Sequence, residues 1–331
     1  MSARELADLC ADLVPVPRGV QVTDLTLDSR KVSEGGLFLA CAGRRTHGLA
    51  SLAQAIARGV RAVLWEPAAG VESPAVPPEV FAAPVAQLSR HASVIADRFF
   101  DTPSATLRVS GITGTNGKTT TAWLLAQALT RAGERSAYLG TLGVGIPAEG
   151  VVAGEYTTAD AVTVQRQLSQ MQQLGARSAA MEVSSHALDQ ARVDGVRFRV
   201  AAFTNLTRDH LDYHHTIEAY GDAKRLLFRG QGLQLAVLNA DDDYAAATAG
   251  VLQGHVRCFT FGMRNAGADI FAERVRFTAA GVEMKVRTPW GEFEFTSALL
   301  GSFNASNLLA VLTTLLAAQS LDEHFDAAAI V

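Results

Sequence analysis

A glycine-rich run joins a strand-like segment to a helix-like segment, and it constrains this chain more than any other feature. Residues 111–121 read Gly-Ile-Thr-Gly-Thr-Asn-Gly-Lys-Thr-Thr-Thr. The apolar stretch Leu107 to Ile112 before the turn is typical of a strand, and the apolar spacing from Lys118 to Leu129 predicts a helix. Such a turn presents backbone N–H groups and a helix N-terminus at one point, and that point attracts phosphate.

Two side chains at the start of the predicted helix suit a nucleotide phosphate. Lys118 supplies a positive charge for the β- and γ-phosphates, and Thr119 offers a hydroxyl to Mg²⁺. The general P-loop pattern has a glycine where this chain has Ile112. A turn that binds nothing is the alternative, but Gly-Lys-Thr directly after a strand argues against it.

Composition excludes several classes of protein. The formal net charge of −4 gives no electrostatic case for nucleic-acid binding. No apolar run approaches the roughly 20 residues of a membrane span, and acidic residues stand where a signal peptide would be apolar. The three cysteines are far apart, which favours a reducing compartment. We therefore expect a soluble, cytoplasmic protein without nucleic-acid partners or membrane insertion.

The alternation of segments predicts an α/β fold of two domains. We expect a small N-terminal α/β domain over residues 1–103, with a loop from Glu66 to Pro84, and a central P-loop domain over 104–331. Strand-like and helix-like segments alternate after Leu107, which predicts a mostly parallel sheet flanked by helices. Residues 268–295 predict a short antiparallel extension, and Asn304–Ala318 an apolar helix. The central strands are predicted at 137–140, 178–183, 200–204 and 235–239, and helices at 161–174 and 217–228.

Polar residues follow two of these strands, and the carboxyl ends of parallel strands are where ligands bind. Glu182 ends one strand and is followed by Val-Ser-Ser-His. A carboxylate there, facing a P-loop, can hold Mg²⁺ directly or through water, although a solvated or salt-bridged Glu is an equal alternative on this residue alone.

The second polar segment, Asn205 to His215, is rich in charge and histidine. His210 and His214 are four residues apart, which on a helix would give one metal-binding face. A zinc site usually needs His-Glu-x-x-His and a third ligand, but position 211 is leucine. A single histidine near a phosphate-bound Mg²⁺ fits better, and a plain polar loop remains an alternative.

Other polar residues give weaker signals. Asn304 and Asn307 would share one face of a helix's first turn, where an amide can read a base edge, and helix capping by Asn304 is equally plausible. The threonines of Tyr156-Thr-Thr-Ala-Asp160 could cap a helix or contact phosphate, and Arg192 could bind an anion. Lys224 looks by spacing like an ordinary surface lysine.

Together these runs resemble the Mur ligases of peptidoglycan synthesis. Thr113 to Thr120 matches the P-loop variant of that family, and the segments at 182–186, 205–213 and 301–307 match in the same order. Within the family the chain is similar to the MurE type, which adds an amino acid to UDP-N-acetylmuramoyl-L-alanyl-D-glutamate. The features that carry this closer resemblance are Asp28-Ser-Arg30, Thr157-Thr158 and Gln190-x-Arg192.

The resemblance implies roles for individual residues. It implies ATP and two Mg²⁺ as cofactors, with Lys118, Glu182, His210 and Lys224 as catalytic residues. One Mg²⁺ would be held by Thr119 and Glu182, and the other by His210 and a carbamylated Lys224. The ATP contacts would be Thr115, Asn116, Gly117, Lys118, Thr119, Thr120, Thr121 and Asn304. The UDP-sugar-peptide contacts would be Leu27, Ser29, Arg44, Arg45, Thr46, Thr157, Thr158, Ser184, Gln190 and Arg192.

The resemblance also implies a mechanism and a domain that this chain lacks. A D-glutamate carboxylate would attack the γ-phosphate of ATP, and an amine would then displace phosphate from the acyl phosphate. The partners would be UDP-N-acetylmuramoyl-dipeptide and a diamino acid, by family frequency meso-diaminopimelate, with the protein a monomer. The family's C-terminal amino-acid-binding domain is absent, so we expect the chain to bind nucleotide-sugar but to ligate poorly or not at all.

Three alternatives remain from the sequence. One is another ligase of the superfamily, such as a different Mur member or a folylpolyglutamate synthetase. Another is a P-loop kinase or switch NTPase, which would need no sugar-peptide carboxylate. The last is a fragment that binds nucleotide-sugar and ATP without catalysis.

Overall fold

The structure, a computed structural model, describes residues 3–43, 46–230 and 232–321. The chain divides into two compact units. The first unit comprises the chain up to Pro103 together with Ala159–Ser169 and Gln190–Val196, and the second contains the remainder. The sequence pattern did not indicate that two later segments join the first unit.

The first unit is a small α/β structure. Its four-stranded parallel sheet has the order β3-β4-β5-β6, and a separate antiparallel pair joins β1 to β2. Buried Leu37, Leu39, Leu64 and Ile95 belong to one apolar cluster, formed between the sheet and helices of this unit. The elements are β1 (Arg4–Glu5), α1 (Leu6–Leu9), β2 (Gln21–Val22), β3 (Leu25–Thr26), η1 (Ser29–Lys31), β4 (Leu37–Ala40), η2 (Gly48–Ser51), α2 (Leu52–Ala57), β5 (Ala62–Trp65), β6 (Phe81–Pro84) and α3 (Leu88–Phe99).

One segment of this unit differs from the prediction. The loop expected over 66–84 ends in β6, which pairs in parallel with β5. Proline and glycine residues around this short strand hid it in the sequence. Pro84 is tolerated because it is the last residue of a strand at the edge of the described sheet.

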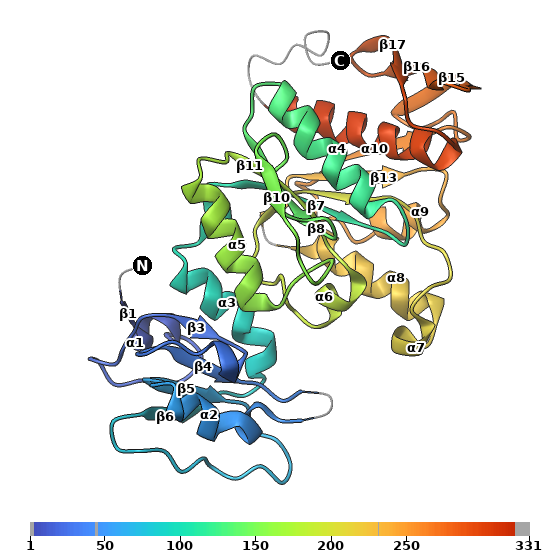
Figure 1. The fold of residues 1–331 in the computed structure, drawn as a ribbon. Helices are drawn as coiled ribbons and strands as arrows, with labels where there is room; N and C mark the ends of the chain where they lie inside the picture. The colour runs from blue at the N-terminus through green and yellow to red at the C-terminus, as the bar shows by residue number, and fades with distance from the viewer. Residues whose placement is uncertain (1–2, 44–45, 231, 322–331) are drawn as a thin grey trace. The chain divides into compact units, whose positions relative to one another are not determined.

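The second unit is built on one large mixed sheet (Figure 1). In the described part its order is β10-β9-β8-β11-β7-β12-β13-β14-β15-β16-β17, parallel from β8 to β15. The antiparallel β15–β17 extension confirms the prediction over 268–295. The strands are β7 (Arg108–Thr113), β8 (Ser136–Gly140), β9 (Gly143–Ile146), β10 (Gly150–Val152), β11 (Ser178–Glu182), β12 (Phe198–Phe203), β13 (Leu235–Asn239), β14 (Arg257–Gly262), β15 (Ile270–Thr278), β16 (Gly281–Thr288) and β17 (Gly291–Ser297).

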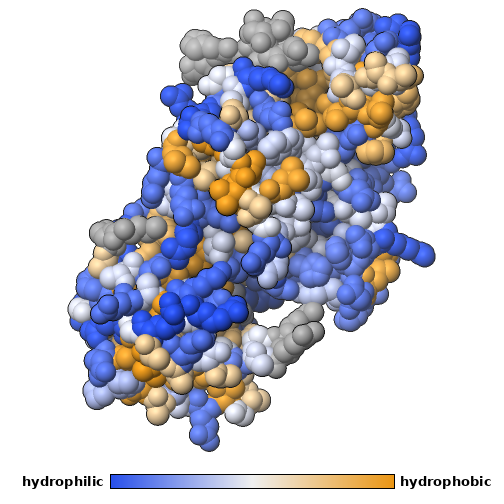
Figure 2. All heavy atoms as spheres, viewed as in Figure 1, coloured by the Kyte–Doolittle hydropathy of each residue, from blue (hydrophilic) through white to orange (hydrophobic). Residues whose placement is uncertain are grey.

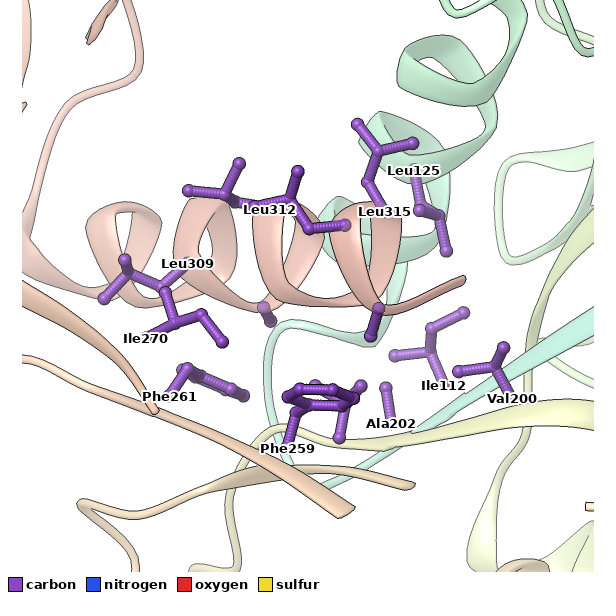
Figure 3. Packing of buried hydrophobic residues seen from close by; sticks show 14 of the residues in the cluster. Ile112, Leu125, Val200, Ala202, Phe259, Phe261, Ile270, Leu309, Leu312 and Leu315 are labelled. Carbon is purple, nitrogen blue, oxygen red and sulfur yellow. The ribbon is translucent and has the colours of Figure 1, made fainter. Parts of the chain in front are cut away.

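Two long helices cover the sheet of the second unit on one side. Figure 3 shows α10 lying over β14, with Leu309 near Ile270 and α4 beside it. Leu309 and Leu316 are fully buried, so the apolar segment predicted at 304–318 is a core helix. The sequence also predicts a helix that begins at Leu321, and this segment lies outside the described residues apart from Leu321 itself. Most of α5 (Ala161–Gln173) belongs to the first unit. The other helices are η3 (Pro103–Ala105), α4 (Lys118–Arg131), α6 (Ser185–Asp189), α7 (Leu211–His214), α8 (Ile217–Arg225), η4 (Leu226–Arg229), α9 (Tyr244–Ala249) and α10 (Ser302–Gln319).

The face of the molecule that Figure 2 shows is mostly hydrophilic among the described residues. Hydrophilic residues cover much of that face, and hydrophobic residues form scattered groups among them. Within the described ranges, no helix has the length and apolar character needed to span a membrane.

The strand order identifies where a ligand should bind in the second unit. The strands that follow β7 in the chain lie on both sides of it: β8 to β11 are on one side, and β12 and the later strands are on the other. In open α/β sheets, ligands bind outside the carboxyl ends of the strands at such a reversal of strand order. The glycine-rich turn after β7 and Glu182 at the end of β11 both lie there.

Candidate functional site

The turn between β7 and α4 has the backbone that a phosphate-binding loop needs. Gly114 and Gly117 have φ of +146° and +85°, values that other residues rarely adopt. A Cβ on Gly114 would lie 1.9 Å from Thr204 Oγ1, so this position also lacks room for a side chain. α4 begins at Lys118, and the N–H groups of its first turn have no acceptor within the helix. These N–H groups are therefore oriented toward the loop, as an anion would require.

The loop after β12 holds the glycine-rich turn in shape. Thr115 N–H donates to the carbonyl of Asn205 (2.8 Å), and Asn116 N–H donates to Asn205 Oδ1 (3.0 Å). Asn205 Nδ2 donates back to the Asn116 carbonyl (3.1 Å), and Thr207 N–H donates to Thr115 Oγ1 (2.9 Å). In the sequence, Asn205 was only the first residue of a polar segment. Its contacts with the glycine-rich turn could not be predicted, because they depend on the pairing of β12 with β7.

Lys118 lies across the loop. Its ammonium donates to the carbonyls of Gly114 (2.9 Å) and Thr115 (2.8 Å), which leaves one of its three hydrogens. Burial lowers the pKa of Lys118, and the negative charges of Glu182 and Asp209 oppose that shift. The lysine is thus held at the loop where a phosphate would meet it.

Glu182 is fully buried and accepts four hydrogen bonds. Oε1 accepts from the hydroxyl of Tyr138 and from Thr141 N–H (2.8 Å). Oε2 accepts from Thr119 Oγ1 (2.8 Å) and Thr141 Oγ1 (3.2 Å). A Cβ on Gly140 would lie 2.2 Å from Glu182 Oε1, so glycine is required for the turn to approach the carboxylate. Glu182 accepts from hydroxyl groups and a backbone N–H, so the alternative of a salt-bridged Glu182 was wrong.

The Thr119–Glu182 pair suits Mg²⁺ by its chemistry. Mg²⁺ prefers hard oxygen ligands, and here a hydroxyl and a carboxylate oxygen meet beside the glycine-rich turn. The donor set therefore fits the ion. In the described part of the chain, no three His, Cys, Asp or Glu side chains group as a metal site.

Lys224 is a buried lysine, in contrast to its surface appearance in the sequence. It is 1% exposed, and its amine donates to the Gly114 carbonyl (2.8 Å), the oxygen that Lys118 also uses. The ring of Tyr220 lies 4.1 Å from Lys224 Nζ. Burial, reinforced by the positive charge of Lys118, lowers the pKa of Lys224 to about 6, against an opposing effect of Asp209. Lys224 is therefore mostly a neutral amine at pH 7.

The two histidines of the second polar segment differ in their surroundings. His210 is the residue before α7, with φ of 51°, so the shared helical face predicted for it and His214 does not form. The His210 side chain is 46% exposed, and its ring packs against His186 and Tyr220. His214 is buried with Nε2 3.0 Å from Ser185 Oγ, and burial lowers its pKa.

The start of α10 contacts the glycine-rich turn through Asn307. A Cβ on Gly117 would lie 2.2 Å from Asn307 Oδ1. Asn307 Nδ2 donates to Asn304 Oδ1 (3.3 Å), and Asn304 Nδ2 donates to the Leu300 carbonyl (2.9 Å). Gly301 is the residue before the helix, so capping by Asn304 was wrong. The half-buried Asn304 is thus hydrogen-bonded to Asn307, and Asn307 lies against Gly117 of the glycine-rich turn.

The remaining predicted residues of the second unit fall into two groups. Thr157 and Ser184 are half-buried, and Ser184 Oγ accepts from Ala187 N–H (3.2 Å) at the start of α6. Thr158 is buried, and its hydroxyl donates a hydrogen bond to the Glu182 carbonyl and accepts one from Ser184 N–H. Thr120 is half-buried, whereas Thr121 is fully buried and its hydroxyl has no hydrogen-bond partner among the described residues.

The first unit holds the other predicted substrate residues. Ser29 is buried and donates to Gln54 Oε1 (2.7 Å). Arg192 donates to Gln190 Oε1 through Nε (3.0 Å) and Nη2 (2.6 Å). Leu27 packs on the apolar core of this unit, and Thr46 is exposed. Arg44 and Arg45 lie outside the described residues.

Asp28 and Arg30 stabilise the turn that carries Ser29. Asp28 Oδ1 accepts from Arg30 N–H (3.0 Å), and the two side chains form a paired ion contact. The Arg30 guanidinium beside Asp28 lowers the pKa of that carboxyl. The pair orders the local backbone, and this explains why the sequence pattern Asp-Ser-Arg occurs at this turn.

Two family descriptions match the chain. One, the Mur ligase middle domain, matches residues 112–315, and the other, the Mur ligase family catalytic domain, matches residues 21–97. The chain belongs to the Mur ligase family.

Relatives with assigned names are similar over most of this chain. It is 45% identical over 299 residues to UDP-N-acetylmuramoyl-L-alanyl-D-glutamate--2,6-diaminopimelate ligase of Pseudomonas aeruginosa, covering 90% of this chain and 61% of the relative. The ligase of the same name from Xanthomonas campestris is 44% identical over 310 residues, covering 93% and 62%. A solved structure of a ligase of this name aligns with TM-score 0.84 and 30% identity over 100% of this chain and 66% of that one. The chain thus spans about three fifths of the length of these curated relatives.

Gly117→Ala should abolish nucleotide binding, because a Cβ would meet Asn307 Oδ1 at 2.2 Å in a backbone of φ +85°. Gly133→Ala is the matched control, since Gly133 has φ of +86° but a Cβ added there would have no atom within 4 Å. We expect both variants to lose about 1 kcal/mol of stability from backbone strain, and only Gly117→Ala to lose affinity for a fluorescent ATP analogue. Equal affinities in the two variants would contradict this account of the turn.

Proposed function

We propose that this chain binds ATP with Mg²⁺ and UDP-N-acetylmuramoyl-L-alanyl-D-glutamate, and that it serves the ATP-dependent addition of a diamino acid to that dipeptide. The observation that carries the proposal is the buried Glu182 carboxylate held against Thr119 at the end of a glycine-rich phosphate-binding turn. Two relatives at 44–45% identity are named as ligases that use this substrate and 2,6-diaminopimelate, which supports the same choice here.

The proposed roles follow from the surroundings of each residue. The first turn of α4 and Lys118 bind the β- and γ-phosphates, while Thr119 and Glu182 provide the oxygen atoms for one Mg²⁺. His210 and Lys224 lie beside Tyr220 and serve a second ion. Asn304 contacts the adenine. In the first unit, Leu27, Ser29, Gln190 and Arg192 contact the UDP-sugar-peptide, with Arg44, Arg45 and Thr46 adding to them. In the second unit, Thr157, Thr158 and Ser184 do so.

The chemistry that these residues serve has two steps. A carboxylate oxygen of the D-glutamate attacks the γ-phosphorus of ATP, so the bond to the β-γ bridging oxygen breaks and ADP leaves. An amine nitrogen then attacks the acyl carbon, loses a proton, and expels phosphate to leave an amide. Two anions must approach each other in the first step, and Mg²⁺ supplies positive charge there. Preorganised donors such as Lys118 are typically worth about 3–4 kcal/mol each in a transition state.

We further propose that Lys224 is carbamylated. The pKa of Lys224 of about 6 leaves a neutral amine at pH 7, and a neutral amine adds to CO₂ with release of one proton. The product carries an anionic carboxylate, whose charge is opposite to that of Lys118, the other lysine that donates to the Gly114 carbonyl. Its oxygens would also suit Mg²⁺.

Carbamylation can be tested by carbon-13 NMR of the protein in ¹³C-bicarbonate. We expect a carbamate signal at pH 8 that is lost as the pH falls through about 6, because protonation of Lys224 removes the reactive amine. The signal should be absent in Lys224→Arg and retained in Lys31→Arg, which changes an exposed lysine. A signal that survives Lys224→Arg would place the modification elsewhere.

The overall proposal is tested by calorimetric binding of UDP-N-acetylmuramoyl-L-Ala-D-Glu, with UDP-N-acetylglucosamine as the control ligand. We expect the dipeptide derivative to bind more tightly than the control, and ATP to bind in a Mg²⁺-dependent manner. ATP binding without any preference for the dipeptide derivative would favour the kinase or switch NTPase alternative. Selective binding of both ligands without phosphate release when a diamino acid is added would favour the binding-only alternative.

A further inference from the structure

Hydroxyl groups around Glu182 form one connected chain, and the direction of each hydrogen bond in it can be worked out. On Oε1, Thr141 donates through its backbone N–H. Tyr138 already accepts from Leu142 N–H (3.2 Å), so the hydroxyl hydrogen of Tyr138 points to Glu182. On Oε2, the contacts come from the hydroxyls of Thr119 and Thr141. A carboxylate only accepts, so all four contacts are donated to it.

The direction of the next contact follows from this. A threonine hydroxyl has one hydrogen, and Thr141 uses its hydrogen on Glu182 (3.2 Å). Thr141 Oγ1 also lies 3.0 Å from Thr157 Oγ1, where either atom could be the donor by geometry alone. Because the hydrogen of Thr141 is committed, Thr157 must be the donor in this pair. Thr157 then has only lone pairs left to offer a ligand.

Thr158 is arranged differently although it is the adjacent residue. Its hydroxyl donates to the Glu182 carbonyl (2.9 Å) and accepts from Ser184 N–H (3.1 Å), and the side chain is buried. Thr158 therefore ties the segment before α5 to the end of β11. Half-buried Thr157 is the threonine that keeps capacity for a ligand.

We propose that Thr141 is a positioning residue. It donates its hydroxyl hydrogen to Glu182 and accepts the hydroxyl hydrogen of Thr157, so that Thr157 can bind a ligand only as a hydrogen-bond acceptor. The ligand group that it takes is an N–H or O–H, such as a peptide amide or sugar hydroxyl. A phosphate or carboxylate oxygen, which needs a donor, is disfavoured. The identity of the ligand rests on the proposed function, whereas the direction of the hydrogen-bond chain does not.

The test compares Thr141→Val, Thr157→Val, the double variant and Thr141→Ser, which keeps the hydroxyl. We expect Thr141→Val to weaken binding of UDP-N-acetylmuramoyl-L-Ala-D-Glu about 5-fold, the loss of roughly one hydrogen bond. Thr141→Ser should bind within about 2-fold of the unmodified chain by the same measure. The double variant should bind no more weakly than the weaker single variant. Unchanged binding by Thr141→Val, or losses that multiply in the double variant, would overturn the proposal.

A second measurement needs no substrate and separates this inference from the proposed function. The melting temperature of the unliganded protein should fall in Thr141→Val and in Thr157→Val, and the double variant should melt close to Thr141→Val alone. The reason is that removing Thr141 already breaks the bond that Thr157 makes. Additive falls in melting temperature would refute the proposed chain of hydrogen bonds, whatever the ligand is. Failure of the unmodified protein to bind the dipeptide derivative would instead refute the proposed function.

Discussion

The structure of the site depends on one buried carboxylate. Glu182 has no exposed surface, and leaving a buried charged group without donors is costly. Four donors, from α4, from β8 and from the turn after β8, surround Glu182 and fix where these elements can lie relative to β11. The glycine at position 140 follows from the same constraint, since a Cβ there would meet the carboxylate.

A second constraint comes from two lysines that share one carbonyl. The carbonyl of Gly114 accepts from both Lys118 and Lys224, and their mutual repulsion adds to burial in lowering the pKa of Lys224. Charged side chains from α4, α8 and β11 therefore meet at the glycine-rich turn: Lys118 and Lys224 donate to the Gly114 carbonyl, and Glu182 accepts from Thr119.

The sequence predicted the elements whose patterns are local. The strand and helix on either side of the glycine-rich turn, the parallel strands β8, β11, β12 and β13, and the antiparallel extension follow from hydrophobic periodicity and glycine placement. It missed β6, whose four residues end in proline, the six-residue strand β14, and the capping of α10 by Gly301. Short elements carry too few residues for a period to appear.

Residues whose roles come from long-range contacts could not be identified from the sequence. Lys224 looked like a surface lysine, because nothing in its own helix reveals that α8 buries it against Gly114. Tyr138 and Thr141 lie in an apolar strand and a turn without any motif, and they matter only because β8 pairs with β11. Asn205 and Asn307 contact the glycine-rich turn from distant segments for the same reason.

The most direct test of this account is Glu182→Gln, measured by ATP affinity with and without Mg²⁺ and by melting temperature. An amide keeps the shape of Glu182 but replaces one acceptor oxygen with a donor, so two of the four hydrogen bonds are lost. The account predicts a fall in melting temperature of several degrees and ATP binding that no longer tightens when Mg²⁺ is added. A variant that melts like the unmodified protein and still binds ATP more tightly with Mg²⁺ would contradict it.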